Sequence, residues 1–517
     1  MTNAQITPPD TLRPAGVRPQ PLSLLAAGIA DVQPQNGGLL VADIAYDSRL
    51  ATPGCLYIGL EGAKTHGAAF AHQARQAGAV AMVTDSRGAQ LAGEPGLPIL
   101  IVDAPRQAMA RLAARLFGDP TNGKLTFGVT GTTGKSTISF MLDAALRAHA
   151  RHVGYIGTIG FTLDGVMIPV RRTTSTTPES PDLQAALALM AQRGADCFVM
   201  EASSGGLALD RLEAIDFDIV GFSNLGRDHL DFHKTMEDYF LAKAKLFRSG
   251  WARQAVINID DAAGRRLCGM ISPNDPKVIT VGAGQGADFR VIGRRIVDGR
   301  QQVTFNHDGV TTQFGLDMPG EFNAQNAMIA LAMMHAAGFE QSVTLAGLSH
   351  AVAPGRMERI DLGDGAPVVF VDFGHTPEAT ETALLAVPRP SIAVLGAGGD
   401  RDTGKRPMMG AAAARQADIV VITDDNPRTE PAEKIRADVM AGALQQAAKS
   451  GHEVTVIDGG DRASAIKKAL AMAEPGWSVA VLGRGDLEFQ EVAGLLIPFR
   501  DADVVRSSWQ QIAGLRP

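Results

Sequence analysis

The sequence predicts an α/β protein of three domains, each built on its own sheet. Three observations lead to this prediction. An apolar run at residues 125–129 leads into a glycine-rich loop and then a helical pattern at residues 138–148, which is the order strand, loop, helix. From residue 368 onward, apolar runs alternate with helical patterns, as in a doubly wound parallel sheet. The length of 517 residues agrees, because a domain usually takes about 100 to 200 residues.

The glycine-rich loop at residues 127–137 reads Phe-Gly-Val-Thr-Gly-Thr-Thr-Gly-Lys-Ser-Thr, the composition of a phosphate-binding P-loop. Glycines let backbone N–H groups approach a polyphosphate, Lys135 can reach its outer phosphates, and the Ser136 hydroxyl can ligate Mg²⁺. The strict spacing requires glycine at position 129, which is valine here, so the match is to a variant. The alternative is a plain glycine turn before a helix. The residues expected at a nucleotide's phosphates are Gly131, Thr132, Thr133, Gly134, Lys135, Ser136 and Thr137.

The composition excludes several classes of protein. A net charge of −7 and a pI near 5.9 argue against a nucleic-acid partner, which would require a basic face. No run approaches eighteen apolar residues, and no signal-peptide core is present, so no membrane partner is expected. The three cysteines lack metal-ligand or disulfide spacing, which fits a reducing cytosol. We therefore expect a cytoplasmic enzyme that acts on small molecules and is a monomer.

Residues 22–118 are predicted to form a small N-terminal α/β domain, after a disordered, proline-rich start at residues 1–21. The predicted strands are residues 39–45, 56–60, 79–83 and 99–102, with a helical segment at 68–77. Asp47, Ser48 and Arg49 follow the first strand directly. Open α/β sheets tend to bind ligands at strand ends, so these side chains are candidates for ligand binding, and a polar turn is the alternative.

The central domain, residues 119–354, has two more strands that end in polar clusters. Glu201 follows the run at residues 195–200, and His229 follows the run at 218–222. In a parallel sheet both would converge on the glycine-rich loop. A carboxylate and an imidazole at that place fit magnesium-bound phosphate chemistry. Taken singly, Glu201 is also compatible with a helix N-cap partner, and His229 with a loop histidine.

The end of the central domain changes character. Short alternating runs at residues 278–316 predict an antiparallel β extension. The segment from Gly320 then opens a helix through Ala336, with Asn323 as its cap and Asn326 as a candidate adenine contact.

The C-terminal domain, residues 355–517, is predicted to be a doubly wound, Rossmann-like sheet. Polar groups follow its strands, which implies a second ligand site along one sheet edge. These groups are Asp372 with His375, the segment 398–405, the segment 424–428 and the segment 483–485.

The ordered motifs along the chain resemble those of the Mur ligases, and most closely those of the UDP-MurNAc-tripeptide synthetases. The resemblance spans about residues 47–505 and rests on the phosphate loop, Glu201-x-Ser-Ser, Asn-Leu-x-Arg-Asp-His-Leu-Asp, Gly-x-Phe-Asn-x-x-Asn, Gly-Arg-Met-Glu, Asp-x-x-His-Thr-Pro, Gly-Gly-Asp-Arg-Asp-x-Gly-Lys-Arg-Pro and Asp-Asn-Pro-Arg. It implies that the first domain binds a UDP-sugar peptide, the central domain ATP and the third domain an incoming amino acid.

The resemblance also implies the chemistry. ATP phosphorylates a peptide carboxylate, and an amine attacks the acyl phosphate to give an amide, ADP and phosphate. Lys135 would hold the phosphates, Ser136 and Glu201 one Mg²⁺, and His229 a second. Lys243 matches the family's carbamylated lysine, although its pattern alone suggests a lysine on a helix surface.

Further roles come from the resemblance alone. Those implied for ATP are Asn326, Arg356, Asp372 and His375. Those implied for the UDP-sugar substrate are Ser48, Thr176, Thr177, Ser203 and Arg211. Those implied for the amino acid are Asp425, Asn426, Arg428, Gly483 and Glu488.

Arg428 in Asp-Asn-Pro-Arg can bind a distal carboxylate at two points, which favours meso-diaminopimelate. The chain departs from the family elsewhere. The family's glutamate near the distal amino group is Leu487, with Glu488 one place later. The other departures are Thr133 for asparagine, Gly205 for histidine, Leu209 for glutamine and Phe373-Gly-His375 for Tyr-Ala-His.

Because these departures lie mainly at substrate positions, two alternatives stay open. One is a paralogous ligase that amidates a different carboxylate in a specialised pathway. The other is a catalytically weak binding or regulatory protein, which the joint presence of Lys135, Glu201, His229 and Lys243 disfavours.

Overall fold

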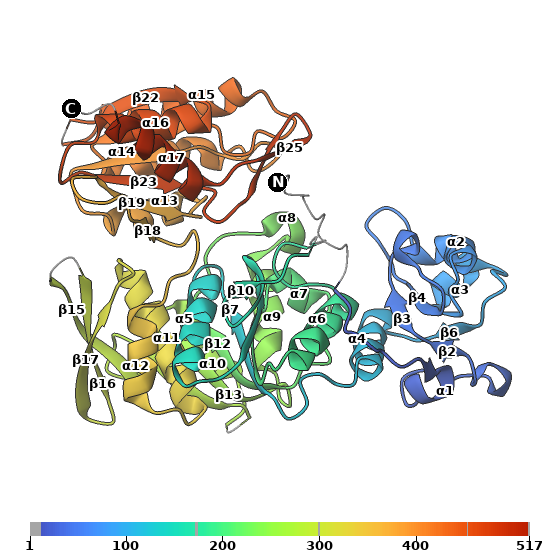
Figure 1. The fold of residues 1–517 in the computed structure, drawn as a ribbon. Coiled ribbons are helices and arrows are strands. Elements are labelled where there is room, and N and C mark those ends of the chain that lie inside the picture. Colours follow the sequence, from blue (N-terminus) through green and yellow to red (C-terminus); the bar gives the residue numbers. More distant parts are fainter. Residues whose placement is uncertain (1–11, 171–173, 274, 298–299, 452, 515–517) are drawn as a thin grey trace. The chain divides into compact units, whose positions relative to one another are not determined.

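The computed structural model describes residues 12–170, 174–273, 275–297, 300–451 and 453–514 (Figure 1). Its contacts divide the chain into two compact units. The first comprises residues 1–290 and 328–347, and the second comprises residues 291–327 and 348–517. Among the described residues, no helix has both the length and the apolar character needed to cross a membrane.

The first unit begins with a four-stranded parallel sheet, drawn in blue in Figure 1. Its strands, in order, are β3 (Asp43–Ala45), β4 (Cys55–Gly59), β5 (Ala81–Thr84) and β6 (Ile99–Ile101). The stretch predicted as one helix is a 3-10 turn (Gly67–Phe70) followed by α2 (Ala71–Gln76). Two further helices, α3 (Ser86–Ala92) and α4 (Pro105–Leu116), were not predicted.

The prediction of a disordered start is wrong for residues 12–21, while residues 1–11 lie outside the described residues. Leu12 is buried in the core of the central part of the unit, and Arg13 pairs with Asp43 and Asp182. β1 (Gln20–Pro21) pairs antiparallel with β2 (Leu40–Val41). The proline-rich composition hid these contacts, because each one depends on residues far away in the sequence.

The central sheet of the first unit is parallel through its middle. Those strands, in order, are β8 (Val153–Gly157), β11 (Cys197–Glu201), β7 (Leu125–Thr130), β12 (Phe217–Phe222), β13 (Ala252–Asn258) and β14 (Lys277–Gly282). β9 (Gly160–Leu163) and β10 (Val166–Met167) add an antiparallel edge. All five residues of β11 are buried, as expected of a strand covered on both faces.

The strand order sets the position of the candidate site. β11 and β12 lie on either side of β7, with Glu201 level with Val129 and Phe222 level with Thr130. Parallel strands end at the same edge, so the segments that follow β7, β11 and β12 meet there. α5 (Lys135–Ala148) leaves this edge and packs on β7, β8 and β11.

The β extension differs from the prediction at its start. β14 is parallel to both β13 and the beginning of β15 (Phe289–Val297), so it belongs to the central sheet. Only the part beyond it, with β16 (Arg300–His307) paired to β17 (Val310–Leu316), is antiparallel as predicted. The helix that follows, α11 (Glu321–Ala336), begins two residues before Asn323, so the prediction of Asn323 as its cap is wrong. The Asn323 amide instead donates to Pro319 O at 2.8 Å.

The second unit contains the C-terminal sheet, which is parallel except for its first strand. Its strands, in order, are β18 (Glu358–Ile360), β19 (Val368–Asp372), β23 (Ser478–Leu482), β20 (Ser391–Leu395), β21 (Ile419–Thr423) and β22 (Thr455–Gly460). Its helices are α13 (Pro377–Leu385), α14 (Lys405–Gln416), α15 (Ala432–Ala447), α16 (Arg462–Met472) and α17 (Asp501–Ala513). A short hairpin of β24 (Phe489–Val492) and β25 (Leu495–Pro498) follows β23.

Candidate active site

The glycine-rich loop joins β7 to α5 through two glycines with positive φ, 152° at Gly131 and 86° at Gly134. A Cβ on Gly131 would also overlap the Ser223 hydroxyl, so this position requires glycine. The first intrahelical bond of α5 runs from Ile138 N to Gly134 O, at 2.9 Å. The N–H groups at the start of α5 are therefore not used by the helix, which is the arrangement that binds phosphate.

The segment after β12 braces the loop. The backbone oxygen of Asn224 accepts from Thr132 N at 2.9 Å, and its side-chain oxygen accepts from Thr133 N at 3.0 Å. The Thr132 hydroxyl accepts from Gly226 N at 2.9 Å. The loop thus keeps its shape through contacts with the neighbouring strand end.

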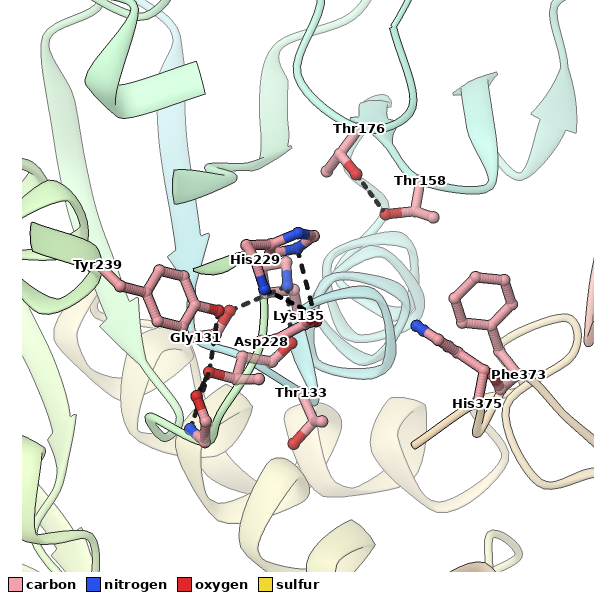
Figure 2. Close-up of polar contacts among 12 residues, drawn as sticks. Gly131, Thr133, Lys135, Thr158, Thr176, Asp228, His229, Tyr239, Phe373 and His375 are labelled. Carbon is pink, nitrogen blue, oxygen red and sulfur yellow. Dashed lines mark hydrogen bonds and ion pairs between the residues drawn. The ribbon is translucent and has the colours of Figure 1, made fainter. Parts of the chain in front are cut away.

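Two lysines converge on one carbonyl of this loop. The Lys135 ammonium donates to Gly131 O at 2.9 Å and to Thr132 O at 3.0 Å. The Lys243 ammonium donates to the same Gly131 O at 2.7 Å. Figure 2 shows Gly131 and Lys135 close to Asp228, His229 and Tyr239.

Lys243 lies on α9 (Met236–Ala244) and is 1% exposed, so the pattern-based reading of a surface lysine is wrong. The pattern failed because α9 is short and its polar residues do not mark one solvent face. Burial and the nearby Lys135 hold the pKa of the Lys243 ammonium well below its usual value, and Asp228 counteracts this only in part. The Tyr239 ring lies 4.6 Å from its nitrogen.

Glu201 is the last residue of β11 and is fully buried. One carboxylate oxygen accepts from the Tyr155 hydroxyl at 2.5 Å and from Thr158 N at 3.1 Å, and the other accepts from the Thr158 hydroxyl at 2.8 Å. These donors fix the carboxylate beside the loop, so the N-cap alternative does not apply. Ser203 has that role instead, since its hydroxyl accepts from Gly206 N at the start of α7 (Ser204–Ala208).

His229 precedes the short helix α8 (Leu230–His233) and has a left-handed backbone, with a φ of 53°. Its ring nitrogen lies 3.5 Å from the Asp228 carboxylate, and its side chain is 57% exposed. A left-handed histidine is strained, and such strain is common at functional sites. The structure brings His229, Asp228 and Lys135 to the same edge of the central sheet (Figure 2), and Lys243 joins them through its bond to Gly131 O.

The donors present suit Mg²⁺ in its usual protein setting. Mg²⁺ takes oxygen ligands and is commonly bound by one or two protein groups together with phosphates and water. Glu201 supplies a carboxylate, and Ser136 supplies a hydroxyl in the first turn of α5. Within the described ranges, no three His, Cys, Asp or Glu side chains are grouped closely enough to hold a metal by themselves.

Four of the five residues implied for the UDP-sugar substrate lie together beside Glu201. The Thr177 hydroxyl donates to Glu201 O at 2.8 Å and lies 2.9 Å from the Ser203 hydroxyl. Thr176 contacts Thr158 at 3.0 Å (Figure 2), and Arg211 donates to Thr177 O at 2.9 Å. Ser48 belongs instead to the N-terminal sheet, where its hydroxyl donates to Gln73 at 3.0 Å.

Arg211 is already paired. Its guanidinium lies 2.9 Å from the Glu179 carboxylate, which also pairs with Arg106 from α4 at 3.0 Å. The Asp47 carboxylate accepts from Arg49 N at 2.9 Å, so the segment 47–49 is a capped polar turn as well as a strand end.

The residues implied for the amino acid meet at the edge of the C-terminal sheet. Asp425, Asn426 and Arg428 follow β21, and Gly483 follows β23. Gly483 has a φ of 110°, and a Cβ there would overlap the Asp425 carboxylate. That carboxylate oxygen, Oδ2, is buried and makes no hydrogen bond within the described residues. The Arg428 guanidinium donates to Gly399 O at 2.5 Å and lies 3.3 Å from Glu491.

Glu488 is exposed and directly precedes the hairpin strand β24. Asp486, two residues earlier, pairs with Arg356 at 2.8 Å. Arg484, in the predicted strand-end segment 483–485, is fully buried and donates to Asn426 Oδ1 at 2.9 Å and to Phe489 O at 2.9 Å. Burial and the nearby Arg462 lower the pKa of Arg484.

The residues implied for adenosine or its phosphates fall into two groups in the second unit. Arg356 lies over the Phe373 ring, 4.3 Å from its centroid. The Asp372 carboxylate accepts from Met357 N and Gly374 N, both at 2.7 Å, and burial raises its pKa. The His375 ring lies 3.1 Å from Phe373 O. Asn326 is buried on α11, and its amide donates to Asn323 at 3.2 Å.

Sequence reasoning missed Tyr155, Thr158 and Tyr239. Of these, Tyr239 could most easily have been predicted, because it precedes Lys243 by four residues and this spacing places both on one helix face. Tyr155 and Thr158 reach Glu201 only through the strand order, which no local pattern reveals.

Three models of known families match the chain. They are described as Mur ligase family, catalytic domain (residues 41–116), Mur ligase middle domain (residues 129–334) and Mur ligase, glutamate ligase domain (residues 355–485).

Curated relatives align over nearly the whole chain. The UDP-N-acetylmuramoyl-L-alanyl-D-glutamate--2,6-diaminopimelate ligase of Streptomyces avermitilis is 40% identical over 519 residues, covering 98% of this chain and 100% of its own. The UDP-N-acetylmuramyl-tripeptide synthetase of Leifsonia xyli is 37% identical over 521 residues, covering 98% and 99%.

Among solved structures, one of a ligase with the same name as the Streptomyces protein superimposes with a TM-score of 0.70 at 31% identity. It covers 95% of this chain and 99% of that one. MurF ligase from Thermotoga maritima in complex with ADP gives a TM-score of 0.59 at 18% identity, covering 92% and 98%, which shows a shared fold.

Proposed function

The chain belongs to the Mur ligase family, and on this premise we propose that it is an ATP-dependent ligase that adds meso-diaminopimelate to UDP-MurNAc-L-Ala-D-Glu. The family resemblance and the α/β fold class predicted from the sequence are confirmed. The main support for the substrates is 40% identity along the full length of a relative that bears this activity in its name. The reaction would place the protein in peptidoglycan precursor synthesis.

The reaction has two steps. An oxygen of the D-Glu carboxylate attacks the γ-phosphorus of ATP, which gives an acyl phosphate and releases ADP. The amine of the incoming amino acid then attacks the acyl carbon, phosphate leaves with the electron pair of the C–O bond, and the nitrogen loses a proton as the amide forms. Both steps require like charges to approach, so the residues of the site mainly position groups and offset negative charge.

Lys135 and the N-terminal turn of α5 supply the positive field for the phosphates. The Thr176, Thr177 and Ser203 hydroxyls and Arg211 surround Glu201 and would hold the peptide carboxylate close to the loop. Bound Mg²⁺ would offset charge on the phosphoryl group, with Ser136 and Glu201 at one ion and His229 at a second. Because Ser203 and α7 follow β11, the neighbour of β7, an acceptor bound there would lie at the same sheet edge as ATP.

Lys243 is proposed to carry a carbamate. Its lowered pKa favours the free amine. The amine nitrogen can attack CO₂ to give the carbamate NH–COO⁻ and one proton. A carbamate nitrogen retains one N–H, so the bond to Gly131 O can persist. The new negative charge would face Lys135 in place of a second positive one, and its oxygens suit Mg²⁺.

For the amino acid, Arg428 is proposed to bind the distal carboxylate, and Asp425 Oδ2 the nearby ammonium. Leu487 offers no counter-charge and Glu488 is exposed, so we expect weaker discrimination at the far amino group than a glutamate at position 487 would give. The remaining donors of Arg428 support this assignment, as does the Asp425 oxygen that has no hydrogen bond from the described part of the chain.

The test uses purified protein with ATP, Mg²⁺, UDP-MurNAc-L-Ala-D-Glu and a panel of amino acids, followed by phosphate release and product mass. Tripeptide formed with meso-diaminopimelate, and little with lysine, is the expected result. We propose a monomer in the cytoplasm, where ATP is present and where thiols such as the unpaired Cys55 stay reduced.

A second candidate is a paralogous ligase that amidates another carboxylate. Gly205 favours it, because a Cβ at this position would meet no atom within 4 Å and the space beside the acceptor residues is open. Turnover of a different carboxylic acid in the same assay, with no tripeptide formed, would select this candidate.

A further inference from the structure

Tyr239 is almost completely buried at the candidate site and has no role in the proposed reaction so far. It lies on α9, four residues before Lys243, so both side chains project from one face of the helix. Its hydroxyl lies 3.0 Å from the Thr132 hydroxyl in the glycine-rich loop. Its ring lies 4.6 Å from the Lys243 nitrogen, which in turn donates to Gly131 O at 2.7 Å.

These contacts form a closed circuit. Starting at Thr132, it passes through the Tyr239 hydroxyl and ring to Lys243, and returns to the loop at Gly131. Two adjacent loop residues are therefore held by two side chains one helical turn apart. Such a circuit fixes the loop more firmly than either contact alone, because moving one residue strains both.

The circuit extends to the segment that carries His229. The Thr132 hydroxyl also accepts from Gly226 N at 2.9 Å, and the His229 ring packs edge-on against Tyr239 with centroids 6.1 Å apart. His233 packs on the same ring at 5.1 Å. Tyr239 thus contacts the loop, Lys243 and the segment 226–233.

We infer that Tyr239 is a positioning residue for the ligase reaction: its hydroxyl holds the phosphate-binding loop in the shape that accepts ATP, and its ring holds Lys243 against Gly131. The inference rests on the proposed function. The two halves of the side chain have separate tasks, and two substitutions separate them. Tyr239→Phe removes the hydroxyl and keeps the ring, whereas Tyr239→Leu removes both.

The first experiment measures affinity for a non-hydrolysable ATP analogue by calorimetry, together with KM for ATP. Loss of one hydrogen bond predicts a roughly two- to tenfold weaker affinity in Tyr239→Phe, with kcat little changed. Thr132→Val should weaken the affinity at least as much, because it also loses the bond from Gly226 N, and the double variant should be no worse than Thr132→Val alone. Tyr57→Phe is the matched control, because it removes a buried tyrosine hydroxyl bonded to Gly67 O at 2.7 Å in the N-terminal sheet.

The second experiment follows Lys243 itself. Wild type and variants are equilibrated with ¹³C-bicarbonate, and the intensity of the carbamate signal is measured by NMR. The signal that disappears in Lys243→Ala is assigned to Lys243. Tyr239→Phe should keep the full signal, whereas Tyr239→Leu should lose most of it, and its kcat should fall about tenfold, because the ring no longer packs on the Lys243 side chain and holds it against Gly131. Thermal melting of each variant shows that the fold persists.

The outcomes separate this inference from the proposed function. A wild-type protein that binds no nucleotide and forms no tripeptide refutes the proposed function. An active wild type whose Tyr239→Phe variant binds the analogue with unchanged affinity overturns the role of the hydroxyl. Equal kcat and equal carbamate signal in the Phe and Leu variants overturn the role of the ring.

Discussion

Replacing Lys243 with methionine should separate stability from activity. With Lys243 as an ammonium, the substitution removes a charged hydrogen bond to Gly131 O, worth about 1.5 to 3 kcal/mol, and a ring contact worth about 1 to 2 kcal/mol. It also removes the cost of burying an ammonium beside Lys135, which is several kcal/mol. These opposing contributions nearly cancel, so the free energy of unfolding at pH 7 should change by no more than about 2 kcal/mol.

Activity should respond differently. If Lys243 carries a carbamate that orders the charges around the phosphoryl group, its loss should cost about 3 kcal/mol or more of transition-state stabilisation, a fall in turnover of at least about 100-fold. Formate or acetate should restore part of the activity of Lys243→Ala, because a small carboxylate can take the place of the carbamate.

The pH dependence of stability gives an independent check. The folded protein holds the pKa of Lys243 below its usual value of 10.5. At a pH between the lowered pKa of the folded state and 10.5, the unfolded chain therefore binds more protons than the folded one. The free energy of unfolding therefore rises with pH across this range. At pH values below the range, burying the ammonium lowers the free energy of unfolding by its full amount. Lys243→Met should remove that rise.

The assay is urea unfolding between pH 6 and pH 10 in bicarbonate-free buffer, with turnover measured in parallel with and without bicarbonate. The control is Lys467→Met, at an exposed lysine on α16 beside the C-terminal sheet. It should alter neither the pH slope of stability nor the turnover. Full activity of Lys243→Met without bicarbonate would refute the reasoning.

Three further substitutions test the site and the fold. Lys135→Ala should raise the activation free energy of the reaction by about 3 kcal/mol, because it removes the charge aimed at the phosphoryl group. Wild-type rates would exclude the phosphate-loop assignment. Arg428→Lys should raise KM for meso-diaminopimelate about tenfold and leave KM for ATP unchanged, since lysine cannot form the paired bonds; equal KM values would remove Arg428 from the amino-acid site. Arg462→Met should destabilise the protein by about 3 to 5 kcal/mol in urea, because it leaves the fully buried Asp501 carboxylate without its partner at 2.7 Å; an unchanged unfolding midpoint would contradict this.

The phosphate loop was readable from the sequence because all of its information is local. The glycines, Lys135 and the apolar strand before them lie within about a dozen residues, and the helix start at Lys135 follows from that order. The meeting of Glu201 with the loop was also predictable, because parallel strands end at a common edge and β11 directly neighbours β7.

What the sequence could not reveal is which groups surround these residues. The local pattern predicts Lys243 on a surface, but α9 packs against the loop and buries it. The local composition predicts Leu12 in a disordered tail, but Leu12 is buried in the central core. Tyr155 reaches Glu201 because β8 pairs with β11, a choice of neighbour that no local pattern determines. Contacts of this kind depend on packing between distant segments, so they become visible only in the folded chain.

The buried arginines near Asp425 bear on substrate choice. Arg484 donates to Asp425 O and Asn426 Oδ1, and on its other side to Phe489 O and Phe499 O, so it joins the amino-acid segment to the hairpin that follows β23. Gln490 adds a bond to Asp425 O at 2.7 Å. The backbone of the segment is therefore fixed before any ligand binds.

That fixed backbone leaves Asp425 Oδ2 as a rigid acceptor whose charge is already partly offset by Arg462 and Arg484. An acceptor of this kind can orient an ammonium but attracts it less strongly than an isolated carboxylate would. The distal carboxylate at Arg428 must then contribute most of the selection. We therefore expect Leu487→Glu to increase the preference for meso-diaminopimelate over a monoamino diacid such as 2-aminopimelate, measured as a ratio of kcat/KM values, by about tenfold to 100-fold, the range of one charged hydrogen bond. The same ratio in the variant and the wild type would show that the far amino group lies away from position 487.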